Sequence, residues 1–204
     1  MEILKAKLDG KSLRKLESLG NPHLIEFVAE YVQHCNPEKV FVCDDSSEDL
    51  TYIRKEAIKN GEERKLATAG HTIHFDHPQD QGRDKKNTRI LMPAGKTLGG
   101  DINVMERQAG LSEIRGIMKD IMKGKEMLVL FRCLGPNKSV FSIPIVQLTD
   151  SYYVAHNEDL LFRPGYDEFK KLGKSDKFFR FIHSLGETKD AVPQNLEGDR
   201  KSVV

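Results

Sequence analysis

Met127-Leu128-Val129-Leu130-Phe131-Arg132 is the stretch of sequence that decides the fold class. Five consecutive apolar residues precede the arginine, which is far fewer than the roughly 20 residues of a membrane-spanning helix. A short apolar run of this kind predicts a β-strand. We expect this strand to lie in a mixed β-sheet on which amphipathic helices pack.

Further segments show strand patterns, and most of them lie late in the chain. They are residues 40–43, 71–76, 88–92, 139–148, 152–155 and 178–183. Pro144 has no backbone N–H, which predicts that its strand lies at an edge of the sheet or carries a bulge. Asp150-Ser151 predicts a hairpin-type turn that side-chain hydrogen bonds hold between two strands.

Helices are expected mainly in the first part of the chain. Asn21-Pro22 joins a capping residue to a proline at the first helical position, and predicts a helix that ends at Cys35. The capping sequence 44–47 predicts a second helix. Apolar residues recur every three or four positions over 114–122 and predict an amphipathic helix that Gly124 closes. Early helices and late strands together predict an α/β or α+β fold, with a mixed β-sheet flanked by helices.

The composition argues against several kinds of partner and location. Lys and Arg total 32 against 31 Asp and Glu, so no global field attracts nucleic acid or an acidic membrane. The N-terminus has no long apolar segment of the kind that secretory signals carry. Cys35, Cys43 and Cys133 show no metal-like spacing, and we expect them to be buried thiols of a protein in the reducing cytoplasm.

Two motifs suggest a phosphate-binding loop and a metal site, but the residues around them support neither. Pro93-Ala94-Gly95-Lys96-Thr97 ends like a phosphate-binding loop, but Ile90 stands where that motif requires glycine, so an ordinary loop is expected. His71, His74 and His77 suggest a metal site. On a strand, however, His74 would face away from the other two. We therefore expect surface or half-buried histidines.

The polar segment 79–86 lies between two predicted strands, where loops often carry function. Arg83 follows Gly82, so the backbone is permissive at that point and the guanidinium can be aimed. Arginine suits the binding of a carboxylate because it can donate two parallel hydrogen bonds. The alternative is a charged face exposed to solvent.

The chain ends on an apolar run that has only begun. Val203-Val204 follows a polar stretch, and no turn residue or polar tail comes after it. Strands are usually bounded by turn residues, and the last residues of a domain are usually polar. We therefore expect the chain to be the front part of a larger protein.

Several segments together resemble the N-terminal region of GTP-dependent phosphoenolpyruvate carboxykinase. The matches occur in the family's order and comprise Asn21-Pro22 with Phe27-Val28, then Pro78, Asp80 and Arg83 within a segment like Asp-Pro-Arg-Asp-Val-Ala-Arg, then residues 122–127, Gly135-Pro136, residues 148–151 with Tyr153-Val154, residues 183–186, and Asp199-Arg200. No single match is specific to the family, but the ordered set of matches is. The resemblance implies an α/β fold in which residues 21–204 are the N-terminal, substrate-side lobe of a two-lobed enzyme. Residues 1–20 are expected to form an N-terminal arm or helix.

The resemblance also implies which residue binds substrate. In that family an arginine at the position of Arg83 binds a carboxylate of oxaloacetate or phosphoenolpyruvate. The present chain has His77 for Asp, Gln79 for Arg and Gln81-Gly82 for Val-Ala, which leaves the exact aim of Arg83 open. The manganese ligands, the loop for GTP and the mobile lid would lie beyond Val204, in a C-terminal catalytic domain. The chain itself would thus contain no catalytic, cofactor-binding or metal-binding residue.

The implied function is that of the substrate-binding lobe of a cytoplasmic lyase of gluconeogenesis. The complete enzyme would convert oxaloacetate and GTP into phosphoenolpyruvate, GDP and CO2 with Mn²⁺ or Mg²⁺, whereas this fragment alone would be inactive. The alternative is a stand-alone, non-catalytic module of related fold that binds a small anion or a protein. Such a module would show a measurable affinity by itself.

Overall fold

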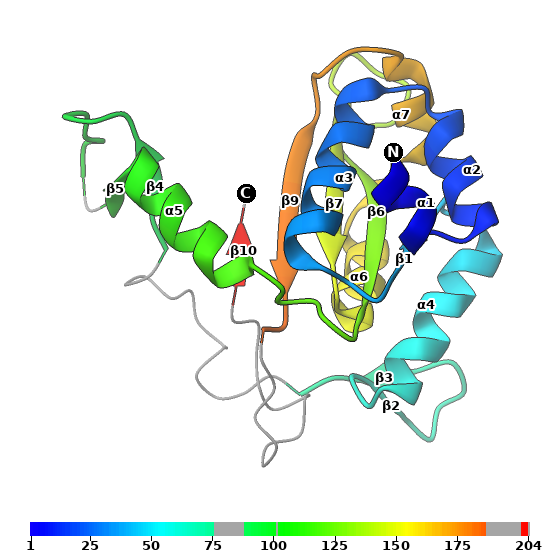
Figure 1. Cartoon of the computed structure of the whole chain (residues 1–204). Helices are drawn as coiled ribbons and strands as arrows, with labels where there is room; N and C mark the ends of the chain where they lie inside the picture. Colours follow the sequence, from blue (N-terminus) through cyan, green and yellow to red (C-terminus); the bar gives the residue numbers. More distant parts are fainter. Residues whose placement is uncertain (76–87, 101, 187–200, 204) are drawn as a thin grey trace.

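The computed structural model describes residues 1–75, 88–100, 102–186 and 201–203 (Figure 1). Its helices are α1 (Glu2–Lys7), α2 (Gly10–Ser18), α3 (Pro22–Cys35), α4 (Ser47–Lys59), α5 (Arg107–Met118), α6 (Tyr152–Leu161) and α7 (Tyr166–Leu172). Its strands are β1 (Lys39–Val42), β2 (Arg64–Lys65), β3 (Thr72–Ile73), β4 (Ile90–Met92), β5 (Val104–Glu106), β6 (Glu126–Leu134), β7 (Ile143–Thr149), β8 (Arg163–Pro164), β9 (Phe179–Ser184) and β10 (Lys201–Val203). The predicted α/β fold with a mixed sheet flanked by helices is confirmed.

The strand predicted from the apolar run 127–132 lies inside the main sheet. It forms β6, in which every residue but the last is buried, and it pairs with β1 on one side and β7 on the other. The strand order is β1-β6-β7-β9-β10, and the short β8 also pairs with β6. The pairs β1/β6 and β7/β9 are parallel, whereas β6/β7 and β9/β10 are antiparallel, so the sheet is mixed as predicted.

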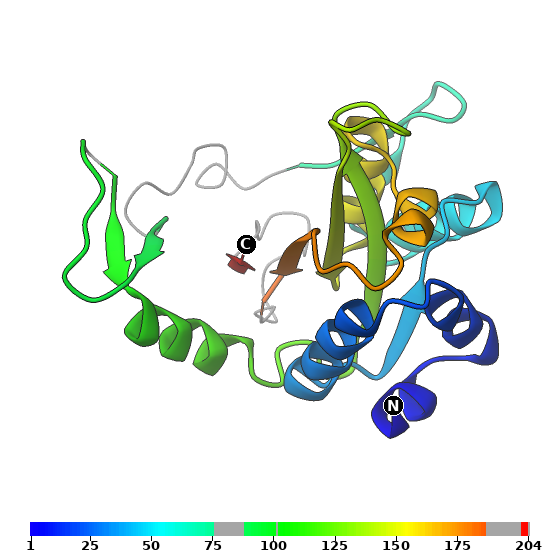
Figure 2. The ribbon, with the colours of Figure 1, turned by 90° about the horizontal axis from the view of Figure 1, so that it is seen from above.

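Helices cover both faces of this sheet, and each face has its own hydrophobic core. On one face, helices α1, α2, α3 and α7 pack on a core that includes Val129 and Phe131. On the other face, α4 and α6 cover Leu128 and Leu130. Figure 2 shows α3 (blue) and α6 (yellow) on opposite sides of the sheet. Successive side chains of a strand point to opposite faces, so one unbroken apolar run supplies both cores.

Capping residues set the starts of two helices as the sequence predicts. Asn21 Oδ1 accepts a hydrogen bond from Leu24 N at 3.0 Å, and Ser46 Oγ accepts one from Asp49 N at 3.3 Å. These side chains satisfy backbone N–H groups that have no partner within the helix. Helix α3 ends at Cys35 as predicted, and the left-handed φ of 52° at the next residue, Asn36, stops it.

The helix predicted over 114–122 has different bounds in the structure. Helix α5 begins at Arg107 and ends at Met118, and turns follow it. Lys119 is extended and Asp120 has a φ of 56°, so neither residue can continue a right-handed helix. The apolar spacing beyond Met118 therefore reflects turn residues, of which Ile121 is half-buried and Met122 is buried, and not a helix.

The expected packing of this helix on the main sheet is correct for its C-terminal half only. Figure 1 shows α5 projecting from the main body together with β4 and β5. Its Gly110 lies so close to Leu91 of β4 that a Cβ atom there would be 2.2 Å from Leu91 Cδ2. Met118 and Met122 are buried in the main core, whereas Ile117 is only half-buried and lies outside that core. Ile114 and Ile121 also pack against this core, so the C-terminal half of α5 and the turn after it reach the main body, whereas α5 also contacts β4 and β5.

The strand predicted at 152–155 is wrong, because these residues form the first turn of α6. Tyr and Val favour strands, but this preference is weak and depends on context. Ser151 Oγ accepts a hydrogen bond from Val154 N at 3.1 Å and so caps a helix. For the same reason Asp150-Ser151 joins a strand to a helix, and the predicted hairpin-type turn is absent at these two residues.

Pro144 does not mark an edge strand, since β7 pairs with both β6 and β9. The β7–β9 pairing begins at Ile145 opposite Phe179, so Pro144 has a strand neighbour on the β6 side only. Its missing N–H removes no hydrogen bond to β9. This local edge explains why the proline is tolerated inside a strand that is otherwise flanked on both sides.

The strands predicted at 71–76 and 88–92 are shorter than expected among the described residues, and they lie in two different small sheets. Strand β3 pairs with β2 in one small sheet, and β4 pairs with β5 in another. Short two-stranded units of this kind have little stability alone and depend on what they pack against. The contacts that hold the β2–β3 unit are therefore important for the segment that follows it.

Residues 1–20 form two helices that pack on the main core. Leu4 and Leu16 are almost fully buried, and Leu8 forms a parallel bridge with Val40. Burial of each such side chain contributes roughly 1.5–3 kcal/mol. The division of the chain into residues 1–20 and 21–204 stays a prediction.

Candidate functional site

Arg83, the predicted substrate-binding residue, lies outside the described residues, as do His77 and the polar segment 79–86. The candidate site is therefore built from described residues that flank this segment. On its N-terminal side the described chain runs from Glu62 through β2 and β3 to Phe75. The contacts of that stretch show which described residues hold the chain just before the segment that carries Arg83.

The motif at 93–97 forms an ordinary turn, as predicted. Lys96 N donates to Pro93 O at 3.0 Å, and Gly95 has a φ of 73°. A phosphate-binding loop opens a helix whose N–H groups face the phosphate. Residues 97–100, which follow the turn, are not helical.

The histidines do not assemble a metal site with the described residues around them. His71 is exposed, whereas His74 is half-buried. Within residues 1–75, 88–100, 102–186 and 201–203 no group of three or more His, Cys, Asp and Glu side chains could hold a metal ion. Metal ligation needs such convergence.

The three cysteines are buried thiols, as predicted. Burial raises the pKa of Cys35 and of Cys43 to about 12 in each case. The thiolate is the reactive form, so these side chains are inert at neutral pH. The described part of the chain also contains no helix that is long and apolar enough to cross a membrane.

Three segments that carry the family resemblance meet at one end of the main sheet. Strand β6 runs opposite to β7 and β9, so the start of β6 lies beside the ends of the other two. Lys125 precedes β6, Asp150 follows β7, and Ser184 ends β9. Residues that are far apart in the sequence thus contribute to one polar cluster, which we call the Asp150 cluster.

The Asp150 carboxylate lies at the centre of this cluster and is 5% exposed. Its Oδ2 accepts hydrogen bonds from Lys125 Nζ and Ser184 Oγ, both at 2.8 Å, and its Oδ1 accepts one from Leu185 N at 2.8 Å. Lys125 Nζ also donates to Gly186 O at 2.8 Å. A buried carboxylate is costly unless it is paired and hydrogen-bonded, and both conditions are met here. The cluster ties the end of β9 to the other two strands.

The residues on either side of Asp150 extend the cluster in two directions. Thr149 Oγ1 shares a hydrogen bond of 2.7 Å with His183 Nδ1 on β9, and it accepts one from Ser151 N at 3.1 Å. Ser151 Oγ donates to Glu62 Oε2 at 2.7 Å. The turn after β7 therefore connects β9 with the segment that begins at Glu62.

Glu62 is a buried carboxylate that holds the start of α6. It is 4% exposed, and burial raises its pKa. Hydrogen bonds from Tyr153 N at 2.8 Å and from Ser151 Oγ favour the charged form and oppose this shift. His74, farther along the same segment, donates from Nδ1 to Glu62 O at 2.6 Å, and its ring stacks on Tyr153.

The next residue, Glu63, makes a second attachment to the same helix. His156 Nδ1 donates to Glu63 Oε1 at 2.7 Å. Burial pushes the pKa of Glu63 upward, but the hydrogen bonds from His156 and Thr72 outweigh it, so the pKa lies below its ordinary value. Two neighbouring carboxylates thus fix one end of the β2–β3 unit to α6.

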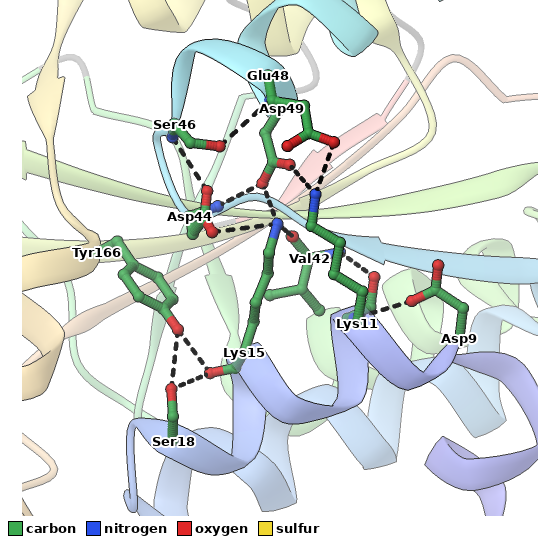
Figure 3. A network of polar contacts seen from close by, with 11 residues as sticks. Asp9, Lys11, Lys15, Ser18, Val42, Asp44, Ser46, Glu48, Asp49 and Tyr166 are labelled. Carbon is green, nitrogen blue, oxygen red and sulfur yellow. Dashed lines mark hydrogen bonds and ion pairs between the residues drawn. The ribbon is translucent and has the colours of Figure 1, made fainter.

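A second buried charged cluster lies beyond the end of β1 (Figure 3). Lys15 Nζ donates to Asp49 and, at 3.3 Å, to Val42 O, and it lies 3.3 Å from Asp44 Oδ2. Tyr166 OH donates to Lys15 O at 2.8 Å. Figure 3 shows the ammonium group of Lys15 between Asp44, Asp49 and the Val42 carbonyl, and Tyr166 at the Lys15 carbonyl. Since the cation is matched by carboxylates on neighbouring elements, we assign this cluster to stability.

The Asp150 cluster can position segments of the chain but is not arranged for covalent or acid–base catalysis. Asp150 and Glu62 already accept hydrogen bonds from the residues they hold, and Lys125 is bound to Asp150. The sequence offers no signal for Glu62 or for its contact with Ser151. No local pattern could have revealed it, because the two residues are 89 positions apart.

Comparisons with known proteins support the family resemblance that these segments carry. A family model described as the phosphoenolpyruvate carboxykinase N-terminal domain matches residues 26–202. A curated protein of Thermococcus kodakarensis named phosphoenolpyruvate carboxykinase (GTP) is 54% identical over 201 residues, which cover 98% of this chain and 32% of that protein. The protein of the same name from Thermococcus sibiricus is 54% identical over 186 residues, covering 91% and 30%, and that of Saccharolobus solfataricus is 43% identical over 187 residues, covering 92% and 30%.

The chain spans about a third of the length of the curated relatives that it matches. The family model, in contrast, extends over most of the chain, including β1, β6, β7, β9 and the turn that carries Asp150. This chain therefore belongs to the phosphoenolpyruvate carboxykinase N-terminal domain family.

Proposed function

We propose that this chain is the substrate-side part of a GTP-dependent phosphoenolpyruvate carboxykinase. The complete enzyme would interconvert oxaloacetate and GTP with phosphoenolpyruvate, GDP and CO2, as a cytoplasmic lyase of gluconeogenesis. The observation that carries the proposal is the 54% identity with the Thermococcus kodakarensis relative over 98% of this chain. About two thirds of that relative has no counterpart in the 204 residues, so the activity of the complete enzyme is part of the proposal.

Within this proposal, residues 21–204 form the substrate-side domain and Arg83 binds a carboxylate of oxaloacetate or phosphoenolpyruvate. A guanidinium can donate two parallel hydrogen bonds to such a group. The role of the chain is then to orient the dicarboxylate before the chemical step. The attachment of the β2–β3 unit to α6 supports this role, because it fixes the chain shortly before Arg83.

The divalent metal ion, Mn²⁺ or Mg²⁺, and GTP are assigned to the part of the complete enzyme that has no counterpart here. The relatives' name specifies GTP. The described residues offer neither a convergent ligand set for a metal ion nor a helix after the turn at 93–97. No step of the reaction is therefore assigned to a metal-binding or nucleotide-binding residue of this chain.

The test is a chimeric enzyme in which this chain replaces the matching residues of the Thermococcus kodakarensis relative. The chimera should form phosphoenolpyruvate from oxaloacetate only in the presence of GTP, and the 204-residue chain alone should not consume GTP. Arg83→Ala should lower kcat/KM for oxaloacetate by about ten- to a hundredfold, since a hydrogen bond to a charged partner contributes roughly 1.5–3 kcal/mol. Arg83→Lys should recover only part of the loss, because a point charge cannot replace the planar fork.

Arg64→Ala is the matched control, since it removes the same charge from an exposed position in β2. It should leave the kinetics of the chimera unchanged. A chimera that melts cooperatively but shows no GTP-dependent turnover of oxaloacetate would contradict the proposed function, and anion binding by such a protein would favour a non-catalytic module. Unchanged kinetics of Arg83→Ala in an active chimera would contradict only the role of Arg83.

A further inference from the structure

We propose that His74, together with Glu62 and Tyr153, is a positioning residue that fixes the base of the segment carrying Arg83. The inference rests on the proposed function, because that function assigns substrate binding to Arg83. It extends the function to side chains that hold the chain in place and need not touch the substrate.

Glu62 and His74 hold Tyr153 from two directions. Glu62 Oε2 accepts a hydrogen bond from Tyr153 N at 2.8 Å, and the Glu62 backbone carbonyl accepts one from His74 Nδ1 at 2.6 Å. The His74 ring lies on the Tyr153 ring with 3.5 Å between centroids and 11° between planes. A carbonyl oxygen can only accept, so Nδ1 carries the proton. The hydrogen bond and the stacking together determine where the His74 ring lies and how it is turned.

We call these contacts of His74 and Glu62 with Tyr153 the anchor. The anchor is attached to buried helices and strands and not to another loop. Tyr153 is the second residue of α6, and Ser151, which caps α6, donates to Glu62 Oε2 at 2.7 Å. The preceding Asp150 is bound by Lys125 and by β9. A group attached to such elements is held more precisely than one attached to a flexible connection.

The distance along the chain makes this anchor relevant to Arg83, which is nine residues beyond His74. Nine fully extended residues span at most about 32 Å, so a fixed His74 limits the space in which the guanidinium can lie. Fixing one end of the segment in advance also reduces the conformational entropy lost when substrate binds. Loss of the anchor should therefore appear in the KM for oxaloacetate and not in the KM for GTP.

The first experiment uses the active chimera and three variants at two histidines. His74→Ala removes the hydrogen bond and the stacking, and should raise the KM for oxaloacetate by about three- to tenfold. His74→Phe retains a ring that can stack on Tyr153, and should recover at least about half of that loss. The control is His71→Ala, which changes an exposed histidine three residues away in the same unit and should have no effect. The KM for GTP should stay within about twofold throughout.

A merely structural role for His74 would affect both substrates alike. Equal increases in both KM values, or an unchanged KM for oxaloacetate in His74→Ala, would overturn the proposal. Partial rescue by His74→Phe together with a selective effect on oxaloacetate would support it.

A second experiment needs no turnover and uses the 204-residue chain. Arg64 and Lys65 of β2 are exposed, so trypsin can cleave after them once the unit opens. Cleavage there should be at least about threefold faster in His74→Ala than in the wild type or His71→Ala, because local opening becomes easier. Equal cleavage rates would show that His74 anchors nothing and would overturn the inference, whatever the fate of the proposed function.

Discussion

Lys15 and Asp49 form a buried ion pair that joins helix α2 to the first turn of α4 (Figure 3). The side chain of Lys15 is 9% exposed and that of Asp49 is 1% exposed. Asp49 Oδ2 also accepts a hydrogen bond from Asp44 N at 2.9 Å, just beyond β1. The pair therefore attaches the first 20 residues to the main sheet by a polar contact as well as by their buried leucines.

Lys15→Met should lower the free energy of unfolding by about 3 kcal/mol, because it removes the buried cation from Asp49 and leaves the partly exposed Lys11, 3.6 Å from Asp49 Oδ1, to pair with this carboxylate. Lys59→Met is the matched control, since the Lys59 side chain is 71% exposed and its Nζ lies 2.8 Å from Glu56 Oε2. An exposed pair of this kind contributes less than about 1 kcal/mol. Urea unfolding followed by circular dichroism measures both changes. Equal losses in the two variants would contradict the argument from burial.

The same cluster should make the fold sensitive to acid. Burial alone would raise the pKa of Asp44, but hydrogen bonds from Ser46 and the charge of Lys15 outweigh it and hold the pKa well below the ordinary 3.8. The carboxylate form of Asp44 thus stabilises the folded state above about pH 4, and this contribution is lost as the pH falls below that value. Unfolding midpoints measured between about pH 6 and pH 2.5 should fall more steeply for the wild type than for Asp44→Asn. Parallel curves would show that Asp44 is not responsible.

Glu158 should have the opposite effect on the pH dependence of stability. Burial raises its pKa to about 7, and Arg132, with Nε 3.9 Å from Glu158 Oε2, offsets this only in part. Between about pH 5 and pH 7 the folded protein then binds more protons than the unfolded chain, so its stability falls as the pH rises. Glu158→Gln should be more stable than the wild type at about pH 8, by roughly 1–3 kcal/mol. If the variant is instead less stable at that pH, the attraction of Arg132 exceeds the cost of burying the charge.

The sequence was most informative where local signals agree with the tertiary structure. The cap Asn21 with Pro22 starts α3 by a local contact, and the run 127–132 becomes the buried strand β6 because five consecutive apolar residues suit a strand covered on both faces, whichever strands it pairs with. The β7–α6 connection was mispredicted because Tyr153 and its neighbours favour strands. Their helical conformation is fixed by the Ser151 cap and by Glu62, which lies 91 positions before Tyr153.

The candidate site was predictable in its parts and not in its assembly. The resemblance singled out residues 148–151 and 183–186, but only the pairing of β7 with β6 and β9 brings Asp150 to Lys125 and Ser184. Glu62 has no sequence signal, since its role depends on contacts across most of the chain. The substrate-binding role of Arg83 stays a prediction.

The last prediction concerns α5, whose apolar stripe suggested a helix packed along the main sheet. Met118 is 1% exposed within the main core, whereas Ile117 is half-buried and lies outside it. Met118→Asp places a charge without a partner in that core and should lower the free energy of unfolding by about 3 kcal/mol or more. Ile117→Asp should lower it by only about 1 kcal/mol, because water can still reach the carboxylate. Urea unfolding of the two variants decides the point, since an equally severe loss in Ile117→Asp would mean that the helix face that carries Ile117 is also buried in the main core.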